Sequence, residues 1–248
     1  MSLLNVSFSP DFPLSSREDE KSHFDACVVI DVLRATSTIV TALNNGASEV
    51  LPVLNLEDAI ELARNGYLIG GERGGIKPTG FSLGNSPAEY CTDVVMNRKI
   101  CLTTTNGTKA LINAKKWADK IYVASFLNLS ATVSILSTYE NIAIICAGND
   151  GDVSYEDTQV AGCIIEGLCA THNYELSDSA LIALNLWQKL RRPQFTGSHA
   201  RKLIKLGFER DVEYCSSIDV SSIVALYNGK VIRKFEGQSM NQRRLMEE

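Results

Sequence analysis

The chain has 248 residues, of which 45% are hydrophobic and 21% are charged, and its formal net charge at pH 7 is −5. This composition is that of a globular protein and argues against a disordered one. Basic residues never gather in runs longer than a pair, which argues against nucleic acid as a partner, because binding of a phosphate backbone needs concentrated lysine and arginine. A small anionic substrate remains compatible with the acidic balance, since a few convergent cations suffice for it.

The sequence contains 7 cysteines, an odd count without any C-x-x-C pair. That pattern favours reduced thiols and a cytoplasmic location over a disulfide framework. The first 20 residues lack the basic and apolar regions of a secretion signal. No stretch has the apolar length needed to cross a bilayer, so we expect no membrane partner.

Secondary structure is expected to alternate between strands and helices in the first part of the chain. Residues 3–8 predict an edge strand, and residues 15–22 an exposed connection. The next expected strands are 27–30, 48–53, 67–70, 99–103, 121–124 and 142–146, and the helices between them are 37–45, 56–65, 108–114 and 128–139. This alternation predicts a layered α/β fold with a largely parallel or mixed central sheet flanked by helices.

After Asp150 the pattern is mainly helical, with helices expected at 158–171, 177–190 and 197–206. Two short runs, 223–227 and 230–234, are joined by Asn228-Gly229 and predict a β-hairpin. Because no low-complexity linker divides the chain, we expect a single domain, residues 1–248, with a helical C-terminal elaboration. Two units of strand, acidic loop and helix, around Asp31 and Asp150, suggest an internal duplication.

Four polar loops, each following an apolar run, carry the chemistry: residues 31–37, 70–87, 103–108 and 147–157. Ligands of parallel sheets bind at the carboxyl ends of the strands, so the loops are expected to converge. They supply hard oxygen ligands, of which Mg²⁺ takes one or two together with a phosphate: Asp31, Glu72, Asp150, Asp152, Glu156 and Asp157. Arg34 and Arg73 offer planar forks for a phosphate or sulfonate.

The first and third loops also offer hydroxyl and backbone N–H groups. Thr36 or Ser37 is expected at the N-cap of the helix that follows Asp31. In the third loop, Gly107 lets the main chain approach a ligand at a helix start. Each loop alone also has a structural interpretation, with Asp31 as a helix cap and Gly70 to Gly75 as a turn without any phosphate-loop pattern. Their joint pattern favours a functional site.

Other kinds of site are disfavoured by the spacing of their residues. His23, His172 and His199 stand alone, without a partner at the spacing of zinc ligands. Ser37 lacks the G-x-S-x-G turn of a nucleophilic serine.

Five blocks of sequence together resemble the 2-phosphosulfolactate phosphatase family. They are Ile30-Asp-Val-Leu-Arg-Ala-Thr-Ser37, Gly70-Gly-Glu-Arg-Gly-Gly75, Gly80-Phe-x-x-x-Asn-Ser-Pro87, Thr103-Thr-Thr-Asn-Gly-Thr108 and the loop from Ala147-Gly to Glu156-Asp157. Matching blocks run in the family's order from about Asp25 to Leu168. The resemblance implies the family's own α/β fold and Mg²⁺-dependent cleavage of 2-phospho-3-sulfolactate to 3-sulfolactate and phosphate, a reaction of coenzyme M biosynthesis.

The loops and the resemblance together give a hypothesis for the site. The expected metal ligands are Asp31, Glu72 and Asp150, and the expected catalytic residues are Asp31, Glu156 and Asp157. The substrate is expected at Arg34, Thr36, Ser37, Arg73, Thr105, Asn106 and Gly107. Either Asp31 attacks phosphorus directly, or water attacks with Glu156 or Asp157 as base. Leu33 stands where aspartyl-phosphate phosphatases commonly carry a second Asp, which favours water.

Alternatives to this hypothesis also stay open. The substrate is a different small phosphorylated hydroxy acid in one alternative, and in another the protein binds an anionic metabolite without catalysis. The number of carboxylates in the loops favours an enzyme over a binding protein. Trp187 and its apolar neighbours fit a homodimer face as well as a core.

Overall fold

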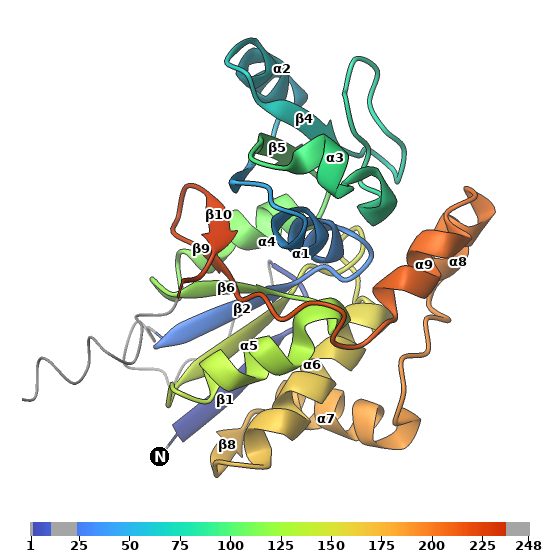
Figure 1. Ribbon diagram of the computed structural model, residues 1–248. Coiled ribbons are helices and arrows are strands. Elements are labelled where there is room, and N and C mark those ends of the chain that lie inside the picture. The colour runs from blue at the N-terminus through green and yellow to red at the C-terminus, as the bar shows by residue number, and fades with distance from the viewer. Residues whose placement is uncertain (1, 11–23, 237–248) are drawn as a thin grey trace, which may run out of the picture.

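The computed structural model describes residues 2–10 and 24–236, and the connection expected at 15–22 lies outside them (Figure 1). The described strands form one ten-stranded sheet in the order β4-β5-β3-β10-β9-β6-β2-β7-β1-β8. The strands are β1 Ser2–Ser7, β2 Ala26–Ile30, β3 Glu49–Pro52, β4 Leu68–Gly71, β5 Lys99–Thr103, β6 Ile121–Ala124, β7 Ile142–Cys146, β8 Tyr174–Leu176, β9 Ala225–Tyr227 and β10 Ile232–Lys234. The predicted α/β fold with a largely parallel or mixed sheet is confirmed.

Two groups of parallel strands make up most of the sheet. β4, β5 and β3 form a three-strand group, and β6, β2, β7, β1 and β8 form a five-strand group. The β9–β10 hairpin lies between the groups and pairs antiparallel with β6 on one side and β3 on the other. Three successive antiparallel pairings therefore make the two groups run in opposite senses.

Two expectations about strand positions need correction or extension. The strand expected at 3–8 is not an edge strand, because β1 lies between β7 and β8, and β8 supplies the edge. The period-2 pattern of β1 gives no sign that a short strand far along the chain covers it. The hairpin predicted around Asn228-Gly229 is confirmed, but it occupies the middle of the sheet.

Helices cover both faces of the sheet. Figure 1 shows α1 Ala35–Asn44 and α4 Gly107–Ala114 close together, and α5 Leu129–Leu136, α6 Tyr155–Cys169 and α7 Asp178–Leu190 on the other side. The remaining helices are α2 Leu56–Arg64, α3 Thr92–Val95, α8 Ser198–Lys205 and α9 Glu209–Cys215, with 3₁₀ turns at Pro87–Glu89 and Phe126–Asn128. All helices expected from the sequence are present, whereas α3 and α9 were not predicted.

The start of α1 differs from the expectation. The helix begins at Ala35 with Arg34 at the N-cap, so neither Thr36 nor Ser37 is the capping residue. Instead, Asp31 Oδ1 accepts the N–H of Ala35 at 3.2 Å. The carboxylate four residues upstream reaches the helix end, which leaves both hydroxyls inside the first turn.

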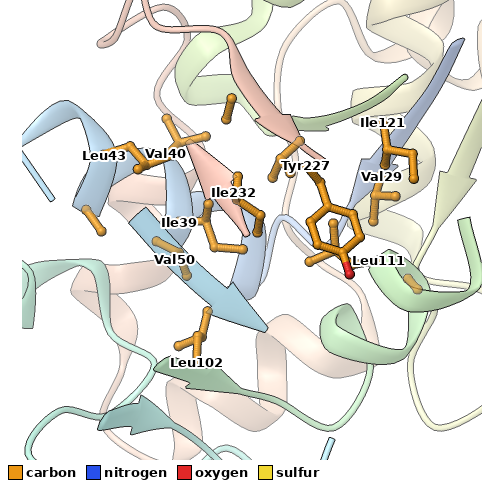
Figure 2. Close-up of a cluster of buried hydrophobic side chains, with 14 of the residues drawn as sticks. Val29, Ile39, Val40, Leu43, Val50, Leu102, Leu111, Ile121, Tyr227 and Ile232 are labelled. Carbon is orange, nitrogen blue, oxygen red and sulfur yellow. The ribbon is translucent and has the colours of Figure 1, made fainter. Parts of the chain in front are cut away.

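The core has two layers, because successive residues of a strand point to opposite faces. Cys27 and Val29 belong to the layer with α1 and α4, whereas Val28 belongs to the layer with α5, α6 and α7. Figure 2 shows Tyr227 and Ile232 of the hairpin within the first of these layers. The hairpin therefore joins the two strand groups through the core as well as through hydrogen bonds.

Trp187 belongs to the second core layer, where 5% of it is exposed. Its ring centroid lies 5.6 Å from that of Phe126. Trp187 is therefore a core residue and does not form a dimer face. A homodimer stays a prediction, but this residue no longer supports it. Each of the 7 cysteines is free. Among the described helices, none combines the length and apolar character that crossing a membrane requires.

Candidate active site

Hydrogen bonds connect the four polar loops to one another, as expected, although the strand-end rule accounts only for convergence within one parallel group. Arg34 Nη2 of the first loop donates to the carbonyl of Gly75 in the second at 2.9 Å. The N–H of Thr105 in the third loop donates to Glu72 Oε1 in the second at 2.7 Å. The N–H of Val32 donates to Asp157 Oδ1 of the fourth loop at 2.9 Å. The loops therefore form one connected unit, although they follow strands of both parallel groups.

Asp31 lies at the centre of this unit. Its carboxylate accepts backbone N–H groups from Ala35 at 3.2 Å and from Gly107. A Cβ atom on Gly107 would lie 2.6 Å from Asp31 Oδ2 and 2.6 Å from the Ala35 Cβ, so only glycine fits there. Burial, with a further contribution from the charge of Glu72, raises the pKa of Asp31 to about 7.

Glu72 is the second carboxylate held by the main chain. Its Oε1 accepts the N–H of Thr105 at 2.7 Å, and its Oε2 accepts the N–H of Gly75 at 2.7 Å. No described cation forms an ion pair with either Asp31 or Glu72. Both carboxylates are oriented by backbone donors, and neither forms an ion pair with a side chain among the described residues.

Arg34 is buried beneath the same loops. Its Nη1 donates to Asp211 Oδ2 at 2.5 Å, and its guanidinium carbon lies 4.0 Å from the ring centroid of Phe208. Asp211 also accepts a hydrogen bond from Ser86 Oγ at 2.7 Å. Asp211 of α9 therefore fixes the guanidinium plane, a role that no sequence motif predicts.

These residues surround a cavity with a volume of about 30 Å³. Asp31, Glu72 and Asp150 contribute carboxylates to its lining, and Arg34 and Lys202 contribute cations. The other lining residues are Leu33, Gly74, Gly75, Asn85, Thr105, Asn106, Asn149, His199 and Leu203. Of the predicted site residues, six line this cavity: Asp31, Arg34, Glu72, Thr105, Asn106 and Asp150.

The predicted substrate residues Thr36, Ser37 and Arg73 contact the loop framework outside the lining. Thr36 Oγ1 accepts the N–H of Asp31, and Ser37 Oγ donates to the carbonyl of Val32. Arg73 Nη2 donates to the Leu54 carbonyl and to Thr103 Oγ1. Gly107 does not line the cavity either, but its N–H supports Asp31.

The two predicted base candidates also lie behind the cavity. Glu156 accepts the N–H of Gly197 at 2.8 Å, next to the first turn of α8. Asp157 accepts the N–H of Val32, and burial, followed by the charge of Asp31, holds the pKa of Asp157 well above its usual range. Their placement favours support of α8 and of the first loop, and their role as bases stays a prediction.

Helix α8 supplies lining residues that the sequence did not mark as functional. His199 and Lys202 line the cavity, and so does Leu203, which anchors α8 in the core. Burial, together with the charge of Lys202, lowers the pKa of His199. Cations on one side of an amphipathic helix usually form a solvated surface, so pattern alone gave no signal for these two residues.

The lining residues fit a hard divalent cation such as Mg²⁺. Within residues 2–10 and 24–236, no cluster of three or more His, Cys, Asp or Glu side chains is arranged to hold a metal ion. Mg²⁺ needs fewer, since it uses one or two carboxylates and keeps several waters. Asp31 and Glu72 could supply these carboxylates, and the lack of an ion pair to either among the described residues favours a cation. Asn85 Oδ1 is buried without a hydrogen-bond partner among the described residues, which leaves a further oxygen free at the lining.

Comparison with known proteins identifies this set of loops. The family model of 2-phosphosulpholactate phosphatase matches residues 13–230. The chain belongs to the 2-phosphosulpholactate phosphatase family. A relative from Thermotoga maritima, named "Probable 2-phosphosulfolactate phosphatase", is 43% identical over 94% of this chain and 99% of its own. Relatives of the same name from Symbiobacterium thermophilum and Clostridium tetani are 40% and 37% identical, over 83% and 87% of this chain and 92% and 95% of their own.

The family confirms the resemblance seen in the sequence blocks. All five blocks fall within the matched residues 13–230. The family name denotes phosphoric monoester hydrolases, so this chain is an enzyme of that class.

Proposed function

We propose that the protein hydrolyses 2-phospho-3-sulfolactate to 3-sulfolactate and phosphate in a reaction that depends on Mg²⁺. The observation that most supports this proposal is that two carboxylates held by backbone donors, Asp31 and Glu72, line the same cavity as the buried Arg34. The names of the relatives support this substrate. In the reaction one water molecule is consumed, the bond between the phosphoryl group and the lactate oxygen breaks, and that oxygen takes up a proton.

The charge of the cavity supports the requirement for a divalent cation. Its lining contains three carboxylates against two cations, and one of these cations, Arg34, is already paired with Asp211. A phosphate ester with a carboxylate and a sulfonate would be repelled by this balance. Asp31 and Glu72, with Asp150 nearby, would hold Mg²⁺, which when bound neutralises the phosphoryl oxygens.

The chain's own groups would orient and stabilise the phosphoryl group. Arg34 lies beneath the cavity with its guanidinium fixed on two sides, so it offers directed donors to the phosphoryl oxygens without rearrangement. Thr105 and Asn106 stand at the start of α4, where side-chain and backbone donors favour an anion. Positioning and charge stabilisation of this kind supply most of the catalysis in phosphoryl transfer.

The attacking group is either Asp31 or water. The Asp31 carboxylate already accepts backbone N–H groups from Ala35 and Gly107, which orients it and favours a supporting role over attack. Rapid mixing with ³²P-labelled substrate followed by acid quench distinguishes the routes. Labelled protein would establish an aspartyl phosphate, whereas its absence during turnover supports direct attack by water.

The proposed function is tested by measuring phosphate release with and without Mg²⁺. The substrates are 2-phospho-3-sulfolactate, 2-phospholactate and 3-phosphoglycerate. We expect release only with the metal, and the highest kcat/KM for the sulfonated ester. Preference for another ester would assign a different phosphorylated hydroxy acid, and binding without release would make the protein a metabolite binder.

Asp31→Asn is the matched variant for the same assay. The amide keeps the size of the side chain but removes its charge, so we expect a loss of about 1,000-fold or more in kcat, the scale of losing a central catalytic group. Circular dichroism checks that the variant is folded. Near-normal turnover by Asp31→Asn would remove this residue from the mechanism.

A further inference from the structure

A second hollow opens beside the catalytic cavity. It has a volume of about 330 Å³, against about 30 Å³ for the catalytic cavity. Its lining consists of Gly74, Ser198, Arg201, Lys202, Lys205 and Leu206. Gly74 and Lys202 line both spaces. We call this second hollow the α8 groove, because most of its lining comes from that helix and the residue after it.

The α8 groove is cationic. Helix α8 contains Arg201, Lys202 and Lys205 and no acidic residue, in a chain whose net charge is −5. Among the described residues, no carboxylate forms an ion pair with Lys202 or Lys205. Arg201 donates to the Thr196 carbonyl, and its charge also acts on the buried Glu156. Lys202 and Lys205 are thus the two cations of the groove that remain available to a ligand.

The α8 groove adjoins the catalytic cavity and offers space for the rest of the substrate. The catalytic cavity has a volume of about 30 Å³ and the groove one of about 330 Å³, so most of the open space beside the carboxylates lies in the groove. The boundary between the two spaces includes Gly74, which has no side chain, and the flexible side chain of Lys202. The charge of Lys202 acts on His199, which places the ammonium group near the catalytic lining.

We propose that the α8 groove binds the non-reacting strong anion of the substrate, and that Lys202 and Lys205 determine specificity for it. The substrate class is then a small phosphate monoester with a second permanently ionised group, such as a sulfonate, a few bonds from phosphorus. This inference rests on the proposed function and adds the residues that select the substrate. An ammonium group suits a sulfonate because it supplies three donors to three acceptor oxygens.

Kinetic selectivity tests the proposal. The ratio of kcat/KM for 2-phospho-3-sulfolactate to that for 2-phospholactate is measured for the wild type, Lys202→Met, Lys205→Met and Lys202→Arg. Lys189→Met, which changes an exposed lysine of α7, is the matched control. Loss of one charged contact is expected to lower the ratio about tenfold in Lys202→Met, and less in Lys205→Met. Lys202→Arg should restore part of the ratio, and the control should match the wild type.

A ratio that stays unchanged in both methionine variants would overturn the proposal while leaving phosphate hydrolysis established. Absence of phosphate release by the wild type would instead overturn the proposed function, and with it the assignment of this subsite.

Calorimetric titration with 3-sulfolactate and with lactate gives a readout that needs no turnover. Binding of 3-sulfolactate should weaken about tenfold in Lys202→Met and stay at the wild-type level in Lys189→Met. Equal affinity of Lys202→Met and the wild type for 3-sulfolactate would contradict a role of the groove in anion binding.

Discussion

Buried carboxylates have different partners in the catalytic cavity and in the seam where β3 meets the β9–β10 hairpin. In the cavity, Asp31 and Glu72 accept backbone N–H groups, and within residues 2–10 and 24–236 no cationic side chain pairs with either. In the seam, Glu49 of β3 accepts from Arg233 of β10 at 2.5 Å and from the Tyr67 hydroxyl at 2.8 Å. Both settings satisfy the oxygens, but only the seam compensates the charge.

This difference separates a functional carboxylate from a structural one. Burial and a neighbouring carboxylate raise the pKa of Asp31. Burial would also raise the pKa of Glu49, but hydrogen bonds from Arg233 and Tyr67 and the charge of Lys99 hold it below the usual value. A carboxylate fixed by the main chain and left without a cation is preorganised to take one from solution. The following variants test this distinction.

After Asp31→Asn, Gly107→Ala should have the largest effect on kcat. The added methyl would lie 2.6 Å from Asp31 Oδ2, so the carboxylate or the start of α4 has to shift. A misplacement on this scale is expected to lower kcat about 100-fold. Gly167→Ala is the control, because there the new methyl meets only the Val133 side chain, at 3.0 Å. Equal kcat for Gly107→Ala and the control would contradict the tight fit at Asp31.

Asp211→Asn should have an intermediate effect, because it removes the charge that orients Arg34. The amide still accepts a hydrogen bond, but the buried guanidinium loses its counter-charge, so we expect about a tenfold rise in KM. Asp219→Asn, at an exposed carboxylate that accepts from Ser130, should leave KM unchanged. An unchanged KM in Asp211→Asn would show that Arg34 keeps its position without the ion pair.

The pH dependence of stability should have opposite signs in the two regions. In metal-free protein, the raised pKa of Asp31 means that the folded state binds more protons than the unfolded state between about 3.8 and 7. The stability contributed by Asp31 is therefore lost as pH rises through this window. Asp31→Asn should become more stable relative to the wild type from pH 5 to pH 8, as measured by thermal unfolding in EDTA. A constant difference in melting temperature would contradict the raised pKa.

Glu49→Gln should have the smallest effect and no effect on kcat. The lowered pKa of Glu49 means that its contribution is present above its ordinary value of 4.5 and is lost as pH falls through the folded-state pKa. Arg233 is 59% exposed, which limits the loss at pH 7 to about 1 kcal/mol. Urea unfolding should show this loss at pH 7 and a smaller one at pH 4, and a reduced kcat would mean that the seam also shapes the cavity.

Part of the convergence of the loops could be predicted, because it follows from local signals. Glu72 and Thr105 follow the neighbouring parallel strands β4 and β5, and Asp31 and Asp150 follow the neighbouring parallel strands β2 and β7, so the strand-end rule accounts for each pair. The two strand groups run in opposite senses, so the rule does not account for the meeting of the two pairs. The resemblance to the family added that the sequence blocks containing these residues occur in the family's order. The same signals could not tell which carboxylates face the cavity, since Glu156 and Asp150 look alike in sequence and only Asp150 lines it.

The contributions of α8 and α9 could not be predicted, because tertiary packing places them. Leu203 and Val212 anchor these helices in the core, and only that packing brings Lys202 to the cavity and Asp211 to Arg34. Likewise, the Asn228-Gly229 turn predicts a hairpin but says nothing about its neighbours in the sheet. Its central position depends on pairing with β3 and β6, which lie far away in the chain.

The central position of the hairpin also affects the order in which the parts of the fold become available during synthesis. Every residue that lines the catalytic cavity precedes residue 204, and Asp211 soon follows. However, Val50 of β3 pairs with Ile232, and Ile121 of β6 pairs with Tyr227. Neither strand can therefore complete its pairing in the seam until the hairpin has been synthesised. A nascent chain on the ribosome therefore contains every residue of the cavity lining before it contains β9 and β10, the strands that join the two strand groups. Pairing of such distant strands is slow, so we expect the two strand groups to reach their final register late in folding.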